Sequence, residues 1–374
     1  MPSVLFWTAK TCRYCWTYRE VPEKIQQKNH SVAINPFLIA PWGNKIPLEL
    51  LLFYMNNSIL LTLIKPSILV GGQAVIDGVM MRVPGAYSTA VRDPDKLIKT
   101  ERHEFVSLTE NSSFWKIPIL RGMVSLFESM KIGIKTLQWS ADISIPEKEA
   151  KEENKLLNWL TTTFAIVLSV VLFMVCPYWI ITHLFEIEKK AMLFNLTAGL
   201  MRITFFLLYL MAISMLNDVK KLFQYHGAEH RVVYNFESGK DVTIKNAQLF
   251  PTQHPRCGTS FMFIVLLSAI LVFALIDTII MGIAGQINLW MRLMFHLPLL
   301  PLVAGIAYEI IKLTTRSNNA LFQWLQKPGL WLQNITTKPP EDSMVEVAIT
   351  ALKSAFGDRY EEVSGSEYVA ETIE

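Results

Sequence analysis

Four long apolar stretches dominate the hydrophobic pattern of the second half of the chain. They cover residues 158–182, 192–216, 260–284 and 288–311. Each is long enough to cross the hydrocarbon layer of a membrane as a helix, which takes about 20 residues. The pattern therefore predicts a multi-pass α-helical membrane protein with about four transmembrane helices in region 158–311.

Residues 65–112 have a different pattern, in which β-branched and other apolar residues alternate with polar residues and glycines. Alternation of this kind is typical of strands, and Asp93-Pro94-Asp95 is typical of a hairpin turn. We therefore expect a small β-rich unit ahead of the apolar stretches. Asp77 and Arg82 are its polar residues of most interest.

Residues 113–157 combine an amphipathic helix with a charged linker. Between Phe114 and Ala141 the apolar residues recur every three or four positions, and residues 146–155 are mostly charged. The basic side chains of the helix would favour an anionic membrane surface. The helix could equally pack on the core of its own unit, and the pattern leaves both positions open.

The two ends of the chain differ from the rest. Residues 1–64 are aromatic, basic and rich in proline, and their apolar patch from Leu48 to Ile64 is shorter than a spanning helix needs. We expect an extension, or a segment that precedes the real start near Met55. The tail, residues 312–374, is expected to hold a helix from about Ser343 to Phe356 and to end in eighteen acidic, loose residues.

Composition and charge agree with a membrane location. The chain is 51% hydrophobic and 18% charged, with a mean hydropathy of +0.30. A net charge of +3 without a long basic run gives nucleic-acid binding no support, and the four scattered cysteines form no disulfide framework. Membrane lipids are the expected partners.

The distribution of basic residues predicts the topology. Thirteen lysines and arginines fall in residues 65–157 and six in 218–259, whereas the two short connections between the apolar stretches hold two and none. By the positive-inside rule, the β-rich unit, loop 218–259 and both termini are cytoplasmic, at the cell membrane. We also expect the second apolar helix to run on without a break into loop 218–259.

The first half of the most informative motif is HGAEHR. It places His226, Glu229 and His230 in the order H-x-x-E-H, with both imidazoles on one face of a helix. Inverted zinc peptidases show this order, and their glutamate acts as general base on a metal-bound water. The alternative is that the histidines bind no metal and are hydrogen-bonded to backbone or water.

The second half of the motif is HPRCGTSF. His254 and Cys257 lie three residues apart, and Pro255 and Gly258 favour a turn that aims both side chains the same way. With the two earlier histidines they offer four ligands for a divalent metal, and nitrogen and sulfur donors favour zinc. Arg256 would stabilise a developing oxyanion or a phosphate.

Ligand number separates two functions. Four protein ligands form a closed shell, which is typical of structural zinc and would favour a non-enzymatic adaptor that binds another membrane protein. Three ligands and a water favour an enzyme, and we expect Cys257 to be the residue outside the shell because a thiolate would blunt Lewis acidity. A transporter is a third possibility, supported only by ionisable residues in or near the apolar stretches, Arg202, Asp277, Arg292, His296 and Glu309.

Six blocks of sequence resemble a known family. In chain order they are GGQAVIDGVMMR, RGMVSLFESM, HGAEHR, HPRCGTSF, PLVAGIAYEI and PGLWLQNITTKPPED. They resemble the YqhQ-like bacterial membrane proteins (domain of unknown function 1385), described as predicted metal-dependent enzymes, over roughly residues 66–356. Asp77 stands where a glutamate is expected, which leaves the role of that carboxylate open.

The resemblance implies a metal site with a basic residue beside it. Carried over by position, the site consists of His226, Glu229, His230, His254 and Cys257, with Arg256 adjacent. Our leading hypothesis is a membrane-embedded, zinc-dependent hydrolase that acts at the cytoplasmic face on a lipid or a membrane peptide. Glu229 would take a proton from the attacking water.

Overall fold

The computed structural model describes residues 37–39, 45–47, 67–145, 155–185, 191–285, 288–316 and 320–370. The chain divides into two compact units, Met1–Ile64 and Lys65–Glu374. In the first unit, β1 (Phe37–Ile39) pairs antiparallel with β2 (Lys45–Pro47). The apolar patch expected from Leu48 to Ile64 lies outside the described residues.

The predicted β-rich unit is confirmed as an antiparallel meander of four strands. These are β4 (Gly71–Val75), β5 (Gly78–Val83), β6 (Ala86–Arg92) and β7 (Ile98–Glu104), paired in chain order. Asp93 begins the turn between β6 and β7, as expected, and its Oδ1 accepts a hydrogen bond from the Leu97 N–H at 2.9 Å. The short helix α3 (Leu108–Asn111) follows the sheet.

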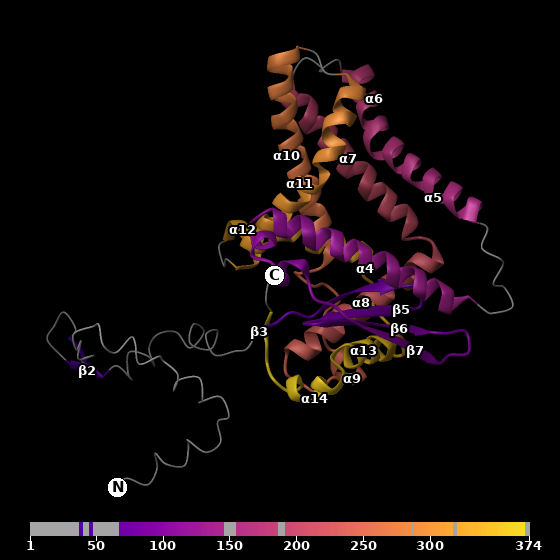
Figure 1. The fold of residues 1–374 in the computed structure, drawn as a ribbon, viewed down its shortest axis with the longest axis vertical. Coiled ribbons are helices and arrows are strands. Elements are labelled where there is room, and N and C mark those ends of the chain that lie inside the picture. Colours follow the sequence, from indigo (N-terminus) through magenta and orange to yellow (C-terminus); the bar gives the residue numbers. More distant parts are fainter. Residues whose placement is uncertain are drawn as a thin grey trace, which may run out of the picture. The chain divides into compact units, whose positions relative to one another are not determined.

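Helices cover both faces of this sheet (Figure 1). Because side chains alternate along a strand, Val79 and Met81 of β5 pack with α8 (Asn217–Glu237) and α13 (Asp342–Phe356), whereas Met80 faces α4 (Leu120–Ser144). The central strands β5 and β6 are therefore almost wholly buried. The unit is a three-layer arrangement in which α8 and α13 lie on one face of the sheet and α4 on the other.

The amphipathic helix begins later than expected. The 3₁₀ turn η4 (Ser113–Lys116) comes first and α4 starts only at Leu120, because Pro118 disfavours helical backbone at the residue before it. Ile132 of α4 packs on the sheet, and α4 also lies against α11 (Leu289–Arg316). Of the charged linker, residues 146–154 lie outside the described residues.

The four apolar stretches form helices that are long and apolar enough to cross a membrane. The first is α5 (Lys155–Val170) continued by the π-helical η6 (Val171–Val175) and α6 (Cys176–Phe185), and the others are α7 (Ala191–Ile213), α10 (Gly258–Ala284) and α11. A further helix, α12 (Ala320–Thr336), packs on α10 and α11. The sequence pattern did not predict α12.

Two expectations about connections are wrong. The second apolar helix does not run on into the histidine motif, because extended backbone at Leu216 separates α7 from α8. Of the last eighteen residues, the described ones, 357–370, are not loose: η7 (Gly357–Arg359) and α14 (Tyr360–Val363) lead to β8 (Val369–Ala370), which pairs with β3 (Ser67–Ile68). Tyr368 anchors this segment by stacking on Phe236 at 5.4 Å between ring centroids.

Candidate metal centre

Three of the four predicted ligands converge. His226 and His230 lie one turn apart on α8, with ring centroids 4.5 Å apart, and Cys257 caps the first turn of α10. The possible ligand atoms of these three residues all lie within 4.8 Å of one another. The His226 Nε2 is 3.2 Å from the Cys257 Sγ.

Hydrogen bonds fix which nitrogen of each histidine faces this group. The Nδ1 of His226 donates to the carbonyl oxygen of Thr336 at 2.9 Å, and the Nδ1 of His230 donates to that of Thr252 at 2.5 Å. A carbonyl oxygen only accepts, so each Nδ1 carries the proton and each Nε2 keeps its lone pair. Backbone bonding of the histidines thus engages one nitrogen per ring and prepares the other as a ligand.

The chemistry of the donors fits a divalent transition metal. In tetrahedral zinc sites, Zn–N lengths of about 2.0–2.1 Å and Zn–S lengths of about 2.3 Å put neighbouring nitrogen and sulfur ligands roughly 3.5 Å apart. The 3.2 Å between the His226 Nε2 and the Cys257 Sγ is close to this spacing. Two imidazoles and a thiol are ligands that zinc prefers. The residues present can therefore hold this ion.

Glu229 lies beside the two histidines. Its Oε2 is 3.9 Å from the Nε2 of both His226 and His230. Burial raises the pKa of Glu229, while His226 and a backbone hydrogen bond from Gly72 act in the opposite direction. A Cβ on Gly72 would come 2.2 Å from the Met80 carbonyl oxygen and 3.2 Å from the Glu229 side chain, so this glycine lets β4 approach the carboxylate closely.

His254 does not join the group, although its ring centroid is 5.5 Å from that of His230. Its Nε2 lies 3.8 Å from the Glu237 Oε2, and burial lowers its pKa to about 4 despite that carboxylate. The expected turn forms, with the Cys257 N–H donating to the His254 carbonyl at 3.3 Å, but the two side chains face different partners. Of the four predicted ligands, His254 is therefore the one outside the group, whereas we expected Cys257 to be outside it.

Arg256 forms a buried ion pair with Glu237. Glu237 did not stand out in the sequence, yet it lies seven residues after His230 and therefore on the same face of α8. The helical spacing that joins His226 to His230 could have identified it. Arg256 is thus held at the site by a carboxylate that also lies next to His254.

α12 supplies partners that the sequence analysis missed. The Gln333 Oε1 accepts the His254 N–H at 2.7 Å, and its Nε2 donates to the His254 carbonyl at 2.8 Å and to the Ser260 Oγ at 2.9 Å. The same helix brings the Thr336 carbonyl to His226. Pro328 and Gly329 argue against a helix in this stretch, which is why these partners could not be identified.

The two polar residues of the sheet reach different places. Asp77 lies in the turn between β4 and β5, with a φ of 52°, and forms an ion pair with Lys221 of α8. A short carboxylate suits this left-handed backbone. Arg82 instead faces the pocket that contains the histidines.

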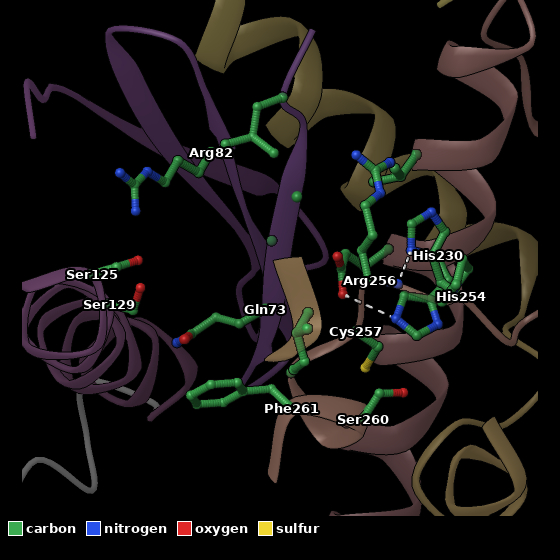
Figure 2. A pocket seen from close by; sticks show the side chains of 18 of the residues that line it. Gln73, Arg82, Ser125, Ser129, His230, His254, Arg256, Cys257, Ser260 and Phe261 are labelled. Carbon is green, nitrogen blue, oxygen red and sulfur yellow. Dashed lines mark hydrogen bonds and ion pairs between the residues drawn. The ribbon is translucent and has the colours of Figure 1, made fainter. Parts of the chain in front are cut away.

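The candidate metal centre opens into a pocket of about 370 Å³. Figure 2 shows His230, His254, Arg256 and Cys257 on one side of it and Arg82, Ser125 and Ser129 on the other. The remaining wall is mostly apolar and comes from α4, α10 and α11, through residues that include Leu126, Ile132, Phe261, Ile264 and Ile311. The pocket is therefore lined by both charged or polar side chains and an apolar surface.

Comparison with known proteins gives a family and one relative. The profile of a family described as "Protein of unknown function (DUF1385)" matches residues 117–358. The uncharacterized protein YqhQ of Bacillus subtilis (strain 168) is 32% identical over 292 residues, which cover 75% of this chain and 89% of the relative. No solved structure matches.

Proposed function

This chain belongs to the DUF1385 family, and from its candidate metal centre we propose that it is a metal-dependent hydrolase working at a membrane surface. His226, His230 and Cys257 would hold a divalent cation, which their donor types suggest is zinc. The observation that carries the proposal is this three-ligand grouping with Glu229 beside it. Three protein ligands leave a fourth position open, as catalytic zinc requires.

The bound cation would supply Lewis acidity that polarises a water or a substrate carbonyl or phosphoryl oxygen. Glu229 accepts a proton from the attacking water and returns it to the leaving group. A general base works best when its pKa approaches the working pH, and burial moves the pKa of Glu229 in that direction. Arg256, oriented by Glu237, presents positive charge to the negative charge that develops on the substrate.

We propose that the four apolar helices span the bilayer, with both termini and the candidate metal centre on the cytoplasmic side. α4 supports this arrangement, because it packs on the sheet and still exposes an apolar stripe composed of Phe127, Met130, Ile134 and Leu137. The helix can therefore pack on the core of its own unit and lie at the membrane surface at the same time, so the two positions considered from the sequence are compatible. The substrate would be a lipid or a membrane peptide that enters the pocket from the bilayer side.

The second candidate function is a membrane adaptor with a structural zinc. It is favoured by His254, whose ring lies next to His230 and whose buried Nε2 makes no hydrogen bond within the described residues. Rotation of this side chain would complete a four-ligand shell, which is typical of structural zinc. The number of protein ligands therefore distinguishes the two functions.

Metal content and X-ray absorption of the detergent-purified protein test the proposal. We expect two nitrogens, one sulfur and one light oxygen ligand, with metal lost in His226→Ala and Cys257→Ala but kept in His254→Ala. A shell of three nitrogens and one sulfur, with metal lost in His254→Ala, would favour the adaptor. Protein without bound metal would overturn both.

Glu229→Gln separates catalysis from metal binding. The amide keeps the size of the side chain but cannot accept the proton, so we expect full metal content and loss of turnover by about 10²–10⁴-fold. Turnover would be followed as new products, by mass spectrometry, after incubation of the protein in nanodiscs made from bacterial lipid extract. Equal product formation by the parent and Glu229→Gln would contradict the role of this carboxylate.

A further inference from the structure

Two neighbouring cavities share a wall that carries positive charge. The pocket at the metal centre and a second cavity of about 380 Å³ are both lined by Leu69, Arg82 and Lys312. Lys116 and Arg121 also line the second cavity, but Arg121 is paired with Glu309, and the one acidic residue among those lining the cavity is Glu110. The two cations of the shared wall thus face the space into which the metal centre opens.

Arg82 is not paired directly with any carboxylate within the described residues. Within the described part of the chain, its side chain forms no ion pair or hydrogen bond, and its guanidinium lies 4.6 Å from the centroid of the Phe105 ring. Burial lowers the pKa of Arg82, and the carboxylates of Glu128 and Glu110 oppose that shift from beyond ion-pair distance. Glu128 is already engaged, since it accepts hydrogen bonds from the Ser107 Oγ at 2.8 Å and the Leu108 N–H at 2.7 Å.

A half-buried, unpaired guanidinium is costly unless a ligand compensates it. Arginine offers five donors in a fork that matches phosphate and carboxylate oxygens. Figure 2 shows Arg82 directed toward the hydroxyls of Ser125 and Ser129, which lie one turn apart on α4. A fork and two hydroxyls supply more donors than the two oxygens of a carboxylate need, and they suit the terminal oxygens of a phosphate.

We propose that Arg82, Lys312, Ser125 and Ser129 form a subsite for the phosphate of an amphiphilic phosphate ester. The apolar part of the ligand lies against Leu126, Phe261 and Ile264 in the same pocket. As a statement about the substrate, this inference rests on the proposed hydrolase function. As a statement about binding, it requires no metal.

Ligand binding to the full chain in nonionic detergent tests the subsite. The probes are dioctanoyl phosphatidic acid, dioctanoylglycerol, which lacks the phosphate, and inorganic phosphate, which lacks the acyl chains. We expect the phosphatidic acid to bind at least about tenfold more tightly than either of the others, as measured by titration calorimetry. Equal binding of dioctanoylglycerol would overturn the phosphate subsite, and equal binding of inorganic phosphate would overturn the apolar one.

Arg82→Gln should weaken phosphatidic acid binding by at least about tenfold and leave dioctanoylglycerol binding unchanged. The matched control is Arg102→Gln on β7, since Arg102 lines neither cavity and bonds the Ala355 carbonyl. If Arg82→Gln fails to fold, the double variant Ser125→Ala/Ser129→Ala should still weaken binding by about threefold or more. Unchanged affinity in a folded Arg82→Gln or in the folded serine variant would overturn the inference.

Metal content measured on the same samples separates this inference from the proposed function. Phosphatidic acid binding that depends on Arg82 in protein without metal would support the subsite while the hydrolase proposal fails. A metal-loaded protein that binds phosphatidic acid and dioctanoylglycerol equally would leave the metal centre standing and overturn the subsite.

Discussion

Gly227, the second residue of the HGAEHR motif, lets two parts of the site approach each other. A Cβ at this position would lie 2.1 Å from the Lys338 carbonyl oxygen. The Lys338 N–H donates to the Phe223 carbonyl at 2.9 Å, so the chain after α12 is tied to α8 at this point. The glycine therefore determines how closely the Thr336 carbonyl lies to His226.

Gly227→Ala should damage the site without changing a ligand. The added methyl must push α8 away from residues 336–338, at a cost of about 1–3 kcal/mol in the free energy of unfolding. Displacing the acceptor of the His226 Nδ1 should also lower metal affinity by about 10–100-fold. Thermal unfolding and metal titration measure the two effects. Gly282→Ala is the matched control, because a Cβ there would meet no atom within 4 Å.

The sequence predicted which site residues lie together on one helix, but not which contacts form between elements that are distant in the chain. His226, Glu229 and His230 share a helical face whatever else the chain does, so their proximity could be predicted from spacing alone. The orientation of His254 could not, because Gln333, 79 residues further along the chain, holds its backbone. Arg82 likewise reaches the pocket through the packing of the sheet against α4.

Among the elements, α12 holds in place the two segments that carry His254 and Cys257, next to the candidate metal centre. Gln333 is fully buried, and its amide bonds both the loop that carries His254 and the first turn of α10. A single side chain thus connects the two segments that supply His254 and Cys257. The sequence pattern did not predict a helix here, so these hydrogen bonds could be identified only in the structure.

Gln333→Leu should destabilise the protein and disturb Cys257. Leucine leaves the His254 N–H and carbonyl without their partner, and an unsatisfied buried group costs about 1–3 kcal/mol. We expect a lower melting temperature and partial loss of metal. Asn334→Leu is the control on the same helix, because that side chain is exposed and, among the described residues, accepts one hydrogen bond, from the Gln253 amide at 2.5 Å. Equal behaviour of the two variants would argue against the proposed support.

α4 exposes two adjacent stripes of opposite character. One is the apolar stripe of residues 127, 130, 134 and 137, and the other holds the exposed polar residues Lys131, Lys135, Gln138 and Asp142. If the helix lies at the membrane surface, the first stripe faces acyl chains and the second faces headgroups or water.

Photo-crosslinking in nanodiscs tests this orientation of α4. Benzoylphenylalanine introduced at Ile134 should crosslink to lipid, whereas the same residue at Lys135, which lies on the polar stripe about 100° further round the helix, should crosslink several-fold less. Mass spectrometry of the adducts provides the measurement. Equal or absent lipid adducts at both positions would show that α4 lies away from the bilayer.

At the scale of the whole molecule, a cluster of polar side chains joins three of the four apolar helices, α7, α10 and α11. The Asp277 carboxylate of α10 pairs with Arg292 of α11, lies 2.9 Å from the His296 Nε2 and accepts a hydrogen bond from the Asn195 amide of α7 at 2.9 Å. All four side chains are buried. We interpret this cluster as the polar link that sets the packing of the bundle and, through α10 and α11, the wall of the pocket.

Asp277→Asn should therefore lower the free energy of unfolding of the protein. Removing the carboxylate leaves Arg292 buried without its counter-charge, and breaking a buried pair in this way costs about 3–5 kcal/mol. Asp277→Leu/Arg292→Leu removes both charges, so it should recover much of that stability, because apolar replacements of a buried pair are often neutral. Melting temperatures in detergent compare these variants with Thr278→Val, a control on the same helix whose hydroxyl, within the part of the chain that the structure describes, donates only to the Ala274 carbonyl. If Asp277→Asn melts like the parent, or the double variant melts below it, the cluster does not hold the bundle together.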